Sequence, residues 1–177
     1  MNKHIPKPII ILVRTQLPQN IGSTARAMKN CGLSELRLVE PREKWPNDGA
    51  NSMAAGADDI LKNIKVFDNI PSALSDVIHV FSLTARNRDI TKIELGPDYA
   101  AKKIYENSTK SEKSAILFGP EQSGLTNDEI AYSNFLVKVP MVENFSSLNL
   151  SQAVLLMSWE WRKLFLKNYL PETEYRK

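Results

Sequence analysis

Short apolar segments alternate with polar segments along most of the chain. Residues 8–13 (PIIILV) and 115–118 (AILF) are continuously apolar, as expected for strands that are covered on both faces. Further strands are predicted at residues 35–39, 64–67, 77–83 and 135–139. Helices or helical turns are predicted between them, at about residues 20–31, 52–61, 71–74, 98–105 and 127–130. This alternation predicts the α/β fold class, with a mainly parallel sheet flanked by helices.

Polar residues and a glycine mark the predicted ends of these helices. Asn20, Ser52 and Asp98 each stand at the start of a helical pattern and are predicted helix caps. Gly32 follows the first of these helices and is predicted to end it.

The last predicted strand leads through a polar loop into a C-terminal helix. Pro140 is predicted to end the strand, because proline cannot donate to a sheet ladder. Asn149, followed three residues later by Gln152, resembles a capping box. The residues beyond have the spacing of one apolar helix face: Leu150, Ala153, Val154, Met157, Trp161, Leu164 and Phe165. A helix start of this kind favours a polar ligand, although from this segment alone an ordinary helix cap is the simpler interpretation.

Composition limits the class of protein. A chain of 177 residues, 42% hydrophobic and 24% charged, is typical of one soluble globular domain, predicted to span residues 1–177. The apolar run near the N-terminus ends at Arg14 without a cleavage site and is better interpreted as a strand than as a signal peptide. One cysteine and two distant histidines predict no disulfide and no structural metal. We therefore expect a cytoplasmic protein with no membrane span. The net charge of +3 permits a nucleic-acid partner without arguing for one.

Four polar loops are expected at the carboxyl edge of the sheet, where parallel sheets bind ligands. They contain residues 18–26, 82–86, 119–125 and 137–154. Common cofactor motifs are absent, because no G-x-G-x-x-G follows the first strand and no G-x-S-x-G occurs. Gly119 and Gly124 have the spacing of a phosphate-binding loop, but Leu125 replaces its lysine. Taken singly, each polar residue in these loops has an ordinary structural explanation.

Taken together and in this order, three of the segments resemble the motifs of a known family. These segments are Asn20–Arg26 (NIGSTAR), Leu117–Leu125 (LFGPEQSGL) and Val139–Ser151, which includes SSLNLS. They are similar to the three motifs of the SpoU/TrmH class of SPOUT methyltransferases. Within that class, SSLNL and the Thr84–Arg86 segment are most similar to the TrmJ-type tRNA 2′-O-ribose methyltransferases.

The resemblance implies a SPOUT fold with a C-terminal trefoil knot, a feature that no hydrophobic pattern predicts. It implies S-adenosylmethionine as the cofactor and a homodimer with active sites near the interface. The last helix is more apolar than one covered face requires, so its large residues are candidates for that interface. They are Met157, Trp159, Trp161 and Phe165.

Residue roles follow from the resemblance by motif. The implied catalytic set consists of Arg26, Asn20, Glu121, Ser147 and Asn149. The implied cofactor pocket consists of Leu83, Thr84, Ala85, Gly119, Val139, Pro140, Met141, Ser147, Leu148 and Asn149. Arginine stays protonated in almost every setting, so Arg26 is expected to clamp a phosphate and polarise the ribose hydroxyl rather than act as a base.

A strip of basic residues is the expected contact with RNA phosphates. It consists of Arg14, Arg26, Lys29, Arg86 and Arg88. TrmJ-type proteins generally carry a C-terminal extension that grips tRNA, whereas this chain ends at Lys177.

The predicted function is transfer of a methyl group from S-adenosylmethionine to an RNA ribose 2′-hydroxyl, with tRNA as the expected substrate. One alternative is a ribosomal RNA 2′-O-methyltransferase of the same class. The other is a non-catalytic RNA-binding module, which would have no need of Arg26, Glu121 and Asn149 together.

Overall fold

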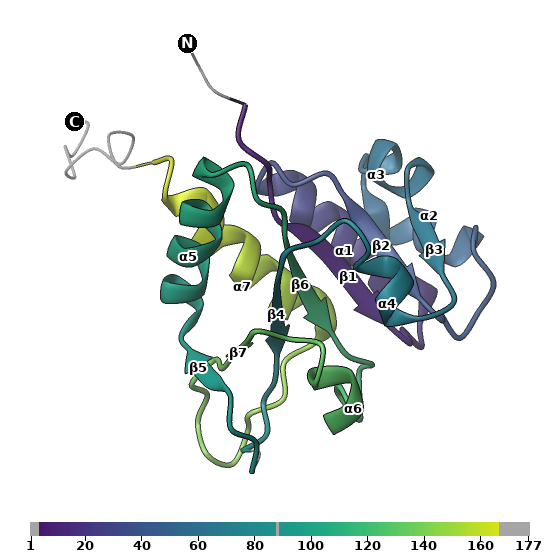
Figure 1. Cartoon of the computed structure of the whole chain (residues 1–177). Coiled ribbons are helices and arrows are strands. Elements are labelled where there is room, and N and C mark those ends of the chain that lie inside the picture. The colour runs from purple at the N-terminus through teal and green to yellow at the C-terminus, as the bar shows by residue number, and fades with distance from the viewer. Residues whose placement is uncertain (1–3, 88, 167–177) are drawn as a thin grey trace, which may run out of the picture.

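A parallel seven-stranded sheet forms the centre of the protein in a computed structural model that describes residues 4–87 and 89–166 (Figure 1). The strands are β1 (Ile9–Val13), β2 (Leu36–Val39), β3 (Lys65–Phe67), β4 (His79–Leu83), β5 (Ile93–Leu95), β6 (Ser114–Phe118) and β7 (Phe135–Val137). Their order is β3-β2-β1-β6-β4-β7-β5, and every neighbouring pair is parallel. The predicted α/β class is confirmed. The trefoil knot stays a prediction.

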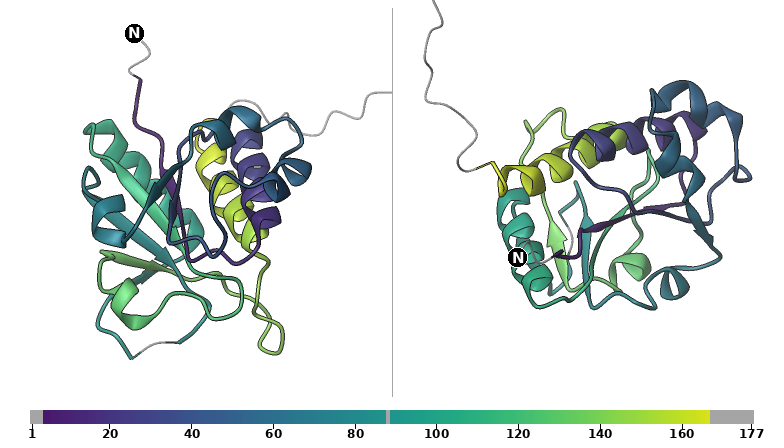
Figure 2. Two further views of the ribbon diagram at one scale, coloured as in Figure 1. Left: turned by 90° about the vertical axis from the view of Figure 1, so that its right-hand side faces the viewer. Right: turned by 90° about the horizontal axis from the view of Figure 1, so that it is seen from above.

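Helices cover both faces of this sheet. They are α1 (Pro18–Asn30), α2 (Asp48–Ala54), α3 (Asp58–Lys62), α4 (Ile70–Ala73), α5 (Pro97–Thr109), α6 (Asn127–Ile130) and α7 (Leu150–Lys163). Figure 2 shows α1 and α7 side by side on one face, with the short helices α4 and α6 on the other. The protein therefore has three layers, as is usual for parallel sheets.

The side chains of β1 point alternately to the two covered faces of the sheet, which explains why its sequence is continuously apolar. Ile10 and Leu12 belong to the core beneath α1, α5 and α7, whereas Ile9, Ile11 and Val13 belong to the core on the opposite face. Successive side chains of a strand point to opposite faces, so a strand covered on both sides needs an apolar residue at each position.

Two predicted helix starts are wrong by two residues or fewer, for the same reason. Helix α1 begins at Pro18 rather than Asn20, and α5 begins at Pro97, ahead of the predicted cap Asp98. Proline is favoured in the first helical position, because its fixed φ suits the helix and its missing N–H is not needed there. Leu17, the residue before α1, supplies no side-chain cap.

The single helix predicted at residues 52–61 is also wrong, because the structure contains two short helices there. Ala55 and Gly56 both adopt positive φ, 45° and 91°, and end α2 before α3 begins. Asn47, not Ser52, caps α2 by accepting the Gly49 N–H at 2.9 Å. Strand β5 was not predicted, and β7 ends at Val137, ahead of Pro140.

Arg37, in the middle of β2, is almost completely buried and is held by an ionic network. Its guanidinium donates to Asp76 at 2.6 and 3.0 Å, to Glu35 at 2.6 and 3.0 Å, and to the Ala73 carbonyl at 2.7 Å. Lys113 also donates to Asp76, at 3.0 Å. The hydrogen bonds from Arg37 hold the pKa of Asp76 well below its usual range.

This network gives a prediction about stability and pH. The pKa of Asp76 is lowered by folding, so its contribution is fully present above the unfolded value of about 3.9 and is lost as the pH falls toward the folded value. Asp76→Asn should lower the free energy of unfolding by about 1–3 kcal/mol at pH 7. The deficit relative to wild type should shrink below pH 4, as measured by urea denaturation at a series of pH values. A deficit that is independent of pH would contradict this assignment.

Candidate active site

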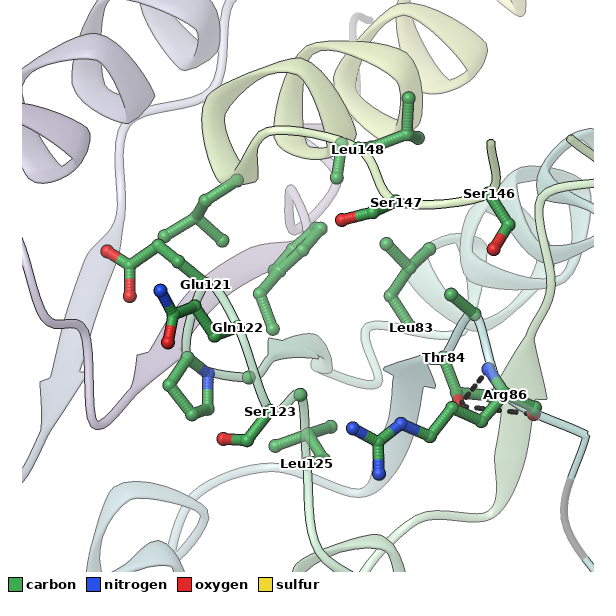
Figure 3. Close-up of a pocket in the computed structure, with 17 residues that line it drawn as sticks. Leu83, Thr84, Arg86, Glu121, Gln122, Ser123, Leu125, Ser146, Ser147 and Leu148 are labelled. Atoms are coloured by element: carbon green, nitrogen blue, oxygen red, sulfur yellow. Dashed lines mark hydrogen bonds between the residues drawn. The ribbon is translucent and has the colours of Figure 1, made fainter. Parts of the chain in front are cut away.

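A cavity of about 240 Å³ opens at the carboxyl ends of β4 and β6 (Figure 3). Three segments line it, residues 83–86, 118–125 and 146–148, together with Leu150 and Ala153 from α7. Three of the four predicted loops therefore meet at one edge of the sheet, as expected for a ligand site in this class of fold. The volume is close to the lower end of the range for small-molecule sites, about 300 Å³.

Gly119 sets the shape of the 119–125 loop. A Cβ atom at this position would lie 2.3 Å from the Leu125 amide nitrogen and 2.8 Å from the Gly124 Cα. The loop therefore folds back onto its own first residue so closely that only glycine fits. Gly124 has φ of +65° and donates its N–H to the Pro120 carbonyl at 2.9 Å, which closes the turn.

The 83–86 segment forms the opposite wall. The Thr84 N–H donates to the Val137 carbonyl at 3.0 Å, which ties the segment to β7. The Thr84 hydroxyl accepts the Arg86 N–H at 3.3 Å. Figure 3 shows the Arg86 side chain extending from this wall toward Ser123 and Leu125. Among the described residues that line the cavity, Arg86 and Glu121 are the two that carry charge.

Glu121 joins the cavity to the start of α1. Its carboxylate accepts the Gln16 N–H at 2.9 and 3.2 Å, the Leu17 N–H at 3.2 Å and the Asn20 side-chain amide at 2.9 Å. These bonds satisfy the amides of Gln16 and Leu17, the two residues that lead into α1, a helix that lacks a side-chain cap from its own sequence. Glu121 is therefore the distant cap of α1, and Asn20 is a partner of that cap rather than the cap itself.

Asn149 extends this network to α7. Its side-chain amide lies 3.5 Å from the Asn20 side-chain oxygen, and its own oxygen accepts the Ser151 N–H at 2.9 Å. The Gln152 side chain accepts the Asn149 N–H at 3.3 Å, so the predicted capping box is confirmed. One hydrogen-bonded chain, Glu121–Asn20–Asn149, thus links all three sequence motifs.

Most of the residues predicted for the cofactor pocket line this cavity. They are Leu83, Thr84, Ala85, Gly119, Ser147 and Leu148, with Glu121 from the predicted catalytic set. Four predicted pocket residues lie outside the lining, in the connection after β7, and their predicted role stays a prediction: Val139, Pro140, Met141 and Asn149. Gln122, Ser123, Leu125 and Ser146 also line the cavity, although no role was predicted for them. These residues lie in or beside the family motifs, and that position could have predicted a place for them in the pocket.

Arg26 lies apart from the cavity, exposed on α1. Six residues after Asn20, the helix has advanced by about 9 Å and turned by about 600°, so the two side chains point about 120° apart. Arg26 forms no hydrogen bond or ion pair with the described part of the chain. Its predicted catalytic role stays a prediction.

The predicted basic strip is not uniform. Arg14 is paired with Glu129 at 2.7 Å, and Lys29 is paired with Asp59 at 2.8 Å. Arg86 lies at the cavity and is exposed. The remaining member, Arg88, lies outside the described residues.

Metal and membrane sites were also sought in the part of the chain that the structure describes. Within residues 4–87 and 89–166, no group of three histidine, cysteine, aspartate or glutamate side chains is placed to hold a metal ion. None of the helices in these ranges has the length and hydrophobicity that a bilayer crossing requires.

A parallel α/β sheet with a glycine-dependent loop and a polar cavity at its carboxyl edge defines a small-ligand-binding domain. The SpoU rRNA Methylase family model matches residues 7–159 of the chain. The chain therefore belongs to the SpoU methylase family, and the resemblance found in the sequence is confirmed.

Relatives of known name are similar over most of this chain. The tRNA (cytidine/uridine/adenosine-2′-O-)-methyltransferase TrmJ of Pseudomonas aeruginosa is 41% identical over 89% of this chain and 61% of its own length. The crystal structure of TrmJ from Z. mobilis ZM4 is 45% identical and has a TM-score of 0.85, covering 95% of this chain and 73% of that one. A probable methyltransferase from Bordetella pertussis is 34% identical with a TM-score of 0.83, covering 92% and 98%. The chain spans about three fifths of the length of the curated relatives that it matches.

Proposed function

We propose that this chain is a single SPOUT domain, residues 1–177, that transfers a methyl group from S-adenosylmethionine to a ribose 2′-hydroxyl of tRNA. One observation carries the proposal: the Glu121–Asn20–Asn149 chain joins three family motifs at the edge of a ligand-sized cavity. Relatives about 40% identical carry the name of tRNA 2′-O-methyltransferases, which supports the RNA class. A cytoplasmic location is part of the same proposal.

The cavity is chemically suited to S-adenosylmethionine. Leu83, Leu125 and Leu148 provide apolar contacts for an adenine ring, and the Ser146 and Ser147 hydroxyls provide hydrogen-bonding groups for a ribose or an amino acid. Arg86 is the cation available for a carboxylate. When bound, the cofactor supplies an electrophilic methyl group. Ser147, Leu148 and the 119–125 loop would hold it against the wall formed by residues 83–86.

The protein's main catalytic contribution would be positioning. In-line transfer requires the acceptor oxygen to be aligned with the methyl group, and fixed geometry lowers the barrier. Glu121, the one carboxylate among the described residues of the cavity lining, already accepts four hydrogen bonds and is not placed to take a proton. We therefore assign proton acceptance to an RNA phosphate or a water molecule, with Arg26 holding the phosphate.

The test is transfer of labelled methyl groups from S-adenosylmethionine to bulk tRNA and, separately, to ribosomal RNA. Nuclease digestion and nucleoside analysis then identify the product. A 2′-O-methylated nucleoside from tRNA is the expected result. Label in ribosomal RNA alone would favour the alternative substrate, and cofactor binding without transfer to either RNA would favour the binding module.

We also propose that the protein forms a homodimer through α7, with a different set of residues from the one the sequence suggested. Met157 and Trp161 are 1% and 4% exposed and belong to the chain's own core. Their predicted place at the interface is therefore wrong, because they pack within the chain. Phe165 packs edge-on against Trp161. Leu155 and Trp159, one helical turn apart, are each 43% exposed and line an apolar hollow.

A charge placed in this hollow should prevent dimerisation. Trp159→Glu is expected to elute as a monomer in size-exclusion chromatography with light scattering, because the dimer would bury an unpaired carboxylate. Tyr99→Glu, at an exposed aromatic residue of α5, is the matched control and should leave the dimer unchanged. A dimeric Trp159→Glu variant would exclude this face as the interface.

A further inference from the structure

Arg14 occupies a constrained position at the carboxyl end of β1. Its φ is +52°, in the left-handed region that residues with a side chain adopt infrequently. Its N–H donates to the Val39 carbonyl at 2.8 Å, which ties it to β2. The backbone therefore fixes the direction in which the Arg14 side chain leaves the sheet.

The Arg14 side chain forms a two-bonded ion pair with Glu129 of α6. Nε donates to Oε1 at 2.7 Å and Nη2 donates to Oε2 at 3.1 Å. Such paired bonds between guanidinium and carboxylate are strong and directional. The Glu129 side chain is 16% exposed, so water screens this pair less than it screens a surface pair.

Glu129 in turn holds the end of the cavity loop. Its Oε2 accepts the Thr126 N–H at 2.7 Å, and the Thr126 hydroxyl accepts the Glu129 N–H at 3.2 Å. Thr126 directly follows Leu125, the last residue of the loop that lines the cavity. Movement of the Glu129 carboxylate would therefore pass directly to that loop.

The loop is thus held near both ends by the same short segment, residues 14–17. Near its first end, Glu121 accepts the N–H groups of Gln16 and Leu17. Beyond its last residue, Glu129 accepts the guanidinium of Arg14. The two carboxylates lie eight positions apart in sequence and enclose residues 122–128 between them.

We propose that Arg14 and Glu129 are positioning residues, which fix the 119–125 loop for cofactor binding, and that Arg14 is not an RNA contact. This inference rests on the proposed function. A phosphate drawn to Arg14 would compete with Glu129 for the guanidinium and weaken the pair that holds the loop, which is a cost. Arg26 forms no ion pair with a described carboxylate and can meet a phosphate without that cost.

The test uses Arg14→Gln, Glu129→Gln and the charge-exchanged variant Arg14→Glu/Glu129→Arg in the whole chain. S-adenosylmethionine affinity is measured by calorimetry, and tRNA affinity is measured at several salt concentrations. Each single variant should bind the cofactor about 10-fold more weakly, and the exchanged pair should recover part of that loss. Lys65→Gln, which breaks the exposed pair with Glu35, is the control and should bind the cofactor as wild type does.

The tRNA measurement separates positioning from RNA contact. Loss of a phosphate contact lowers the slope of log affinity against log salt by about 1, whereas a positioning residue leaves it unchanged. A lower slope in Arg14→Gln with wild-type cofactor affinity would overturn the proposal. So would wild-type cofactor affinity in both single variants.

Amide hydrogen exchange gives a readout that depends on neither ligand. Residues 121–126 should exchange faster in both single variants than in wild type, while β1 and β6 stay protected. Unchanged exchange in this loop would overturn the inference. Absence of S-adenosylmethionine binding to the wild-type protein would overturn the proposed function instead, and the exchange result would still decide the role of the pair.

Discussion

Glu121→Gln is expected to reduce methyl transfer by about 100-fold or more and to destabilise the fold by about 1–3 kcal/mol. The Glu121 carboxylate accepts four hydrogen bonds from Gln16, Leu17 and Asn20. A glutamine side chain offers one acceptor oxygen, and its amide group would face N–H donors. The start of α1 would then lose its cap, and the link between Asn20 and the cavity loop would loosen.

The two effects must appear together if Glu121 positions the site. Turnover is measured by labelled methyl transfer and stability by urea denaturation, with Asp128→Asn as the control at an exposed carboxylate of α6. If Glu121 were instead a general base, turnover would fall while the free energy of unfolding stayed at the wild-type value. That result would contradict the assignment.

Gly119→Ala is expected to weaken S-adenosylmethionine binding at least 10-fold and to cost about 1–3 kcal/mol of stability. The added Cβ would meet the backbone of Gly124 and Leu125 at 2.3–2.8 Å. These are backbone atoms that cannot rotate away, so the whole 119–125 loop would have to shift. Because this loop forms one wall of the cavity, the site would change shape with it.

A second glycine provides the control for this substitution. Gly96 has an ordinary φ of −69°, and a Cβ there would meet the Asp98 side chain at 3.1 Å, a contact that can adjust. Gly96→Ala should therefore bind the cofactor as wild type does. If calorimetry gave the Gly119→Ala variant the same S-adenosylmethionine affinity as wild type, the loop would not contact the ligand.

The sheet was predictable where local sequence decides the structure. Strands β1 and β6 are covered on both faces, so every position is buried, all but Ser114 are apolar, and the pattern is unambiguous. Helix α1 was placed two residues late, because Asn20 was expected to cap it, whereas Pro18 begins the helix and the capping carboxylate comes from Glu121, about 100 residues away. The break at Ala55 was missed because alanine is a strong helix former and here adopts a left-handed conformation.

The site was predictable to the extent that family motifs define it. Asn20, Glu121 and Asn149 were named from the sequence, and the structure joins them by hydrogen bonds. The sequence could not show that Arg14 has a partner, because Glu129 lies 115 positions away. The sequence also could not separate Trp159 from Trp161, since both lie on an apolar helix and only packing decides which is exposed.

The central claim is that the cavity between residues 83–86, 119–125 and 146–148 binds S-adenosylmethionine. A crystal structure of the protein grown with S-adenosylhomocysteine, the demethylated product, tests it most directly. The account predicts the adenosine between Leu83 and Leu148, with the 119–125 loop against it. Density for the ligand at another place on the protein, with this cavity empty, would contradict the account.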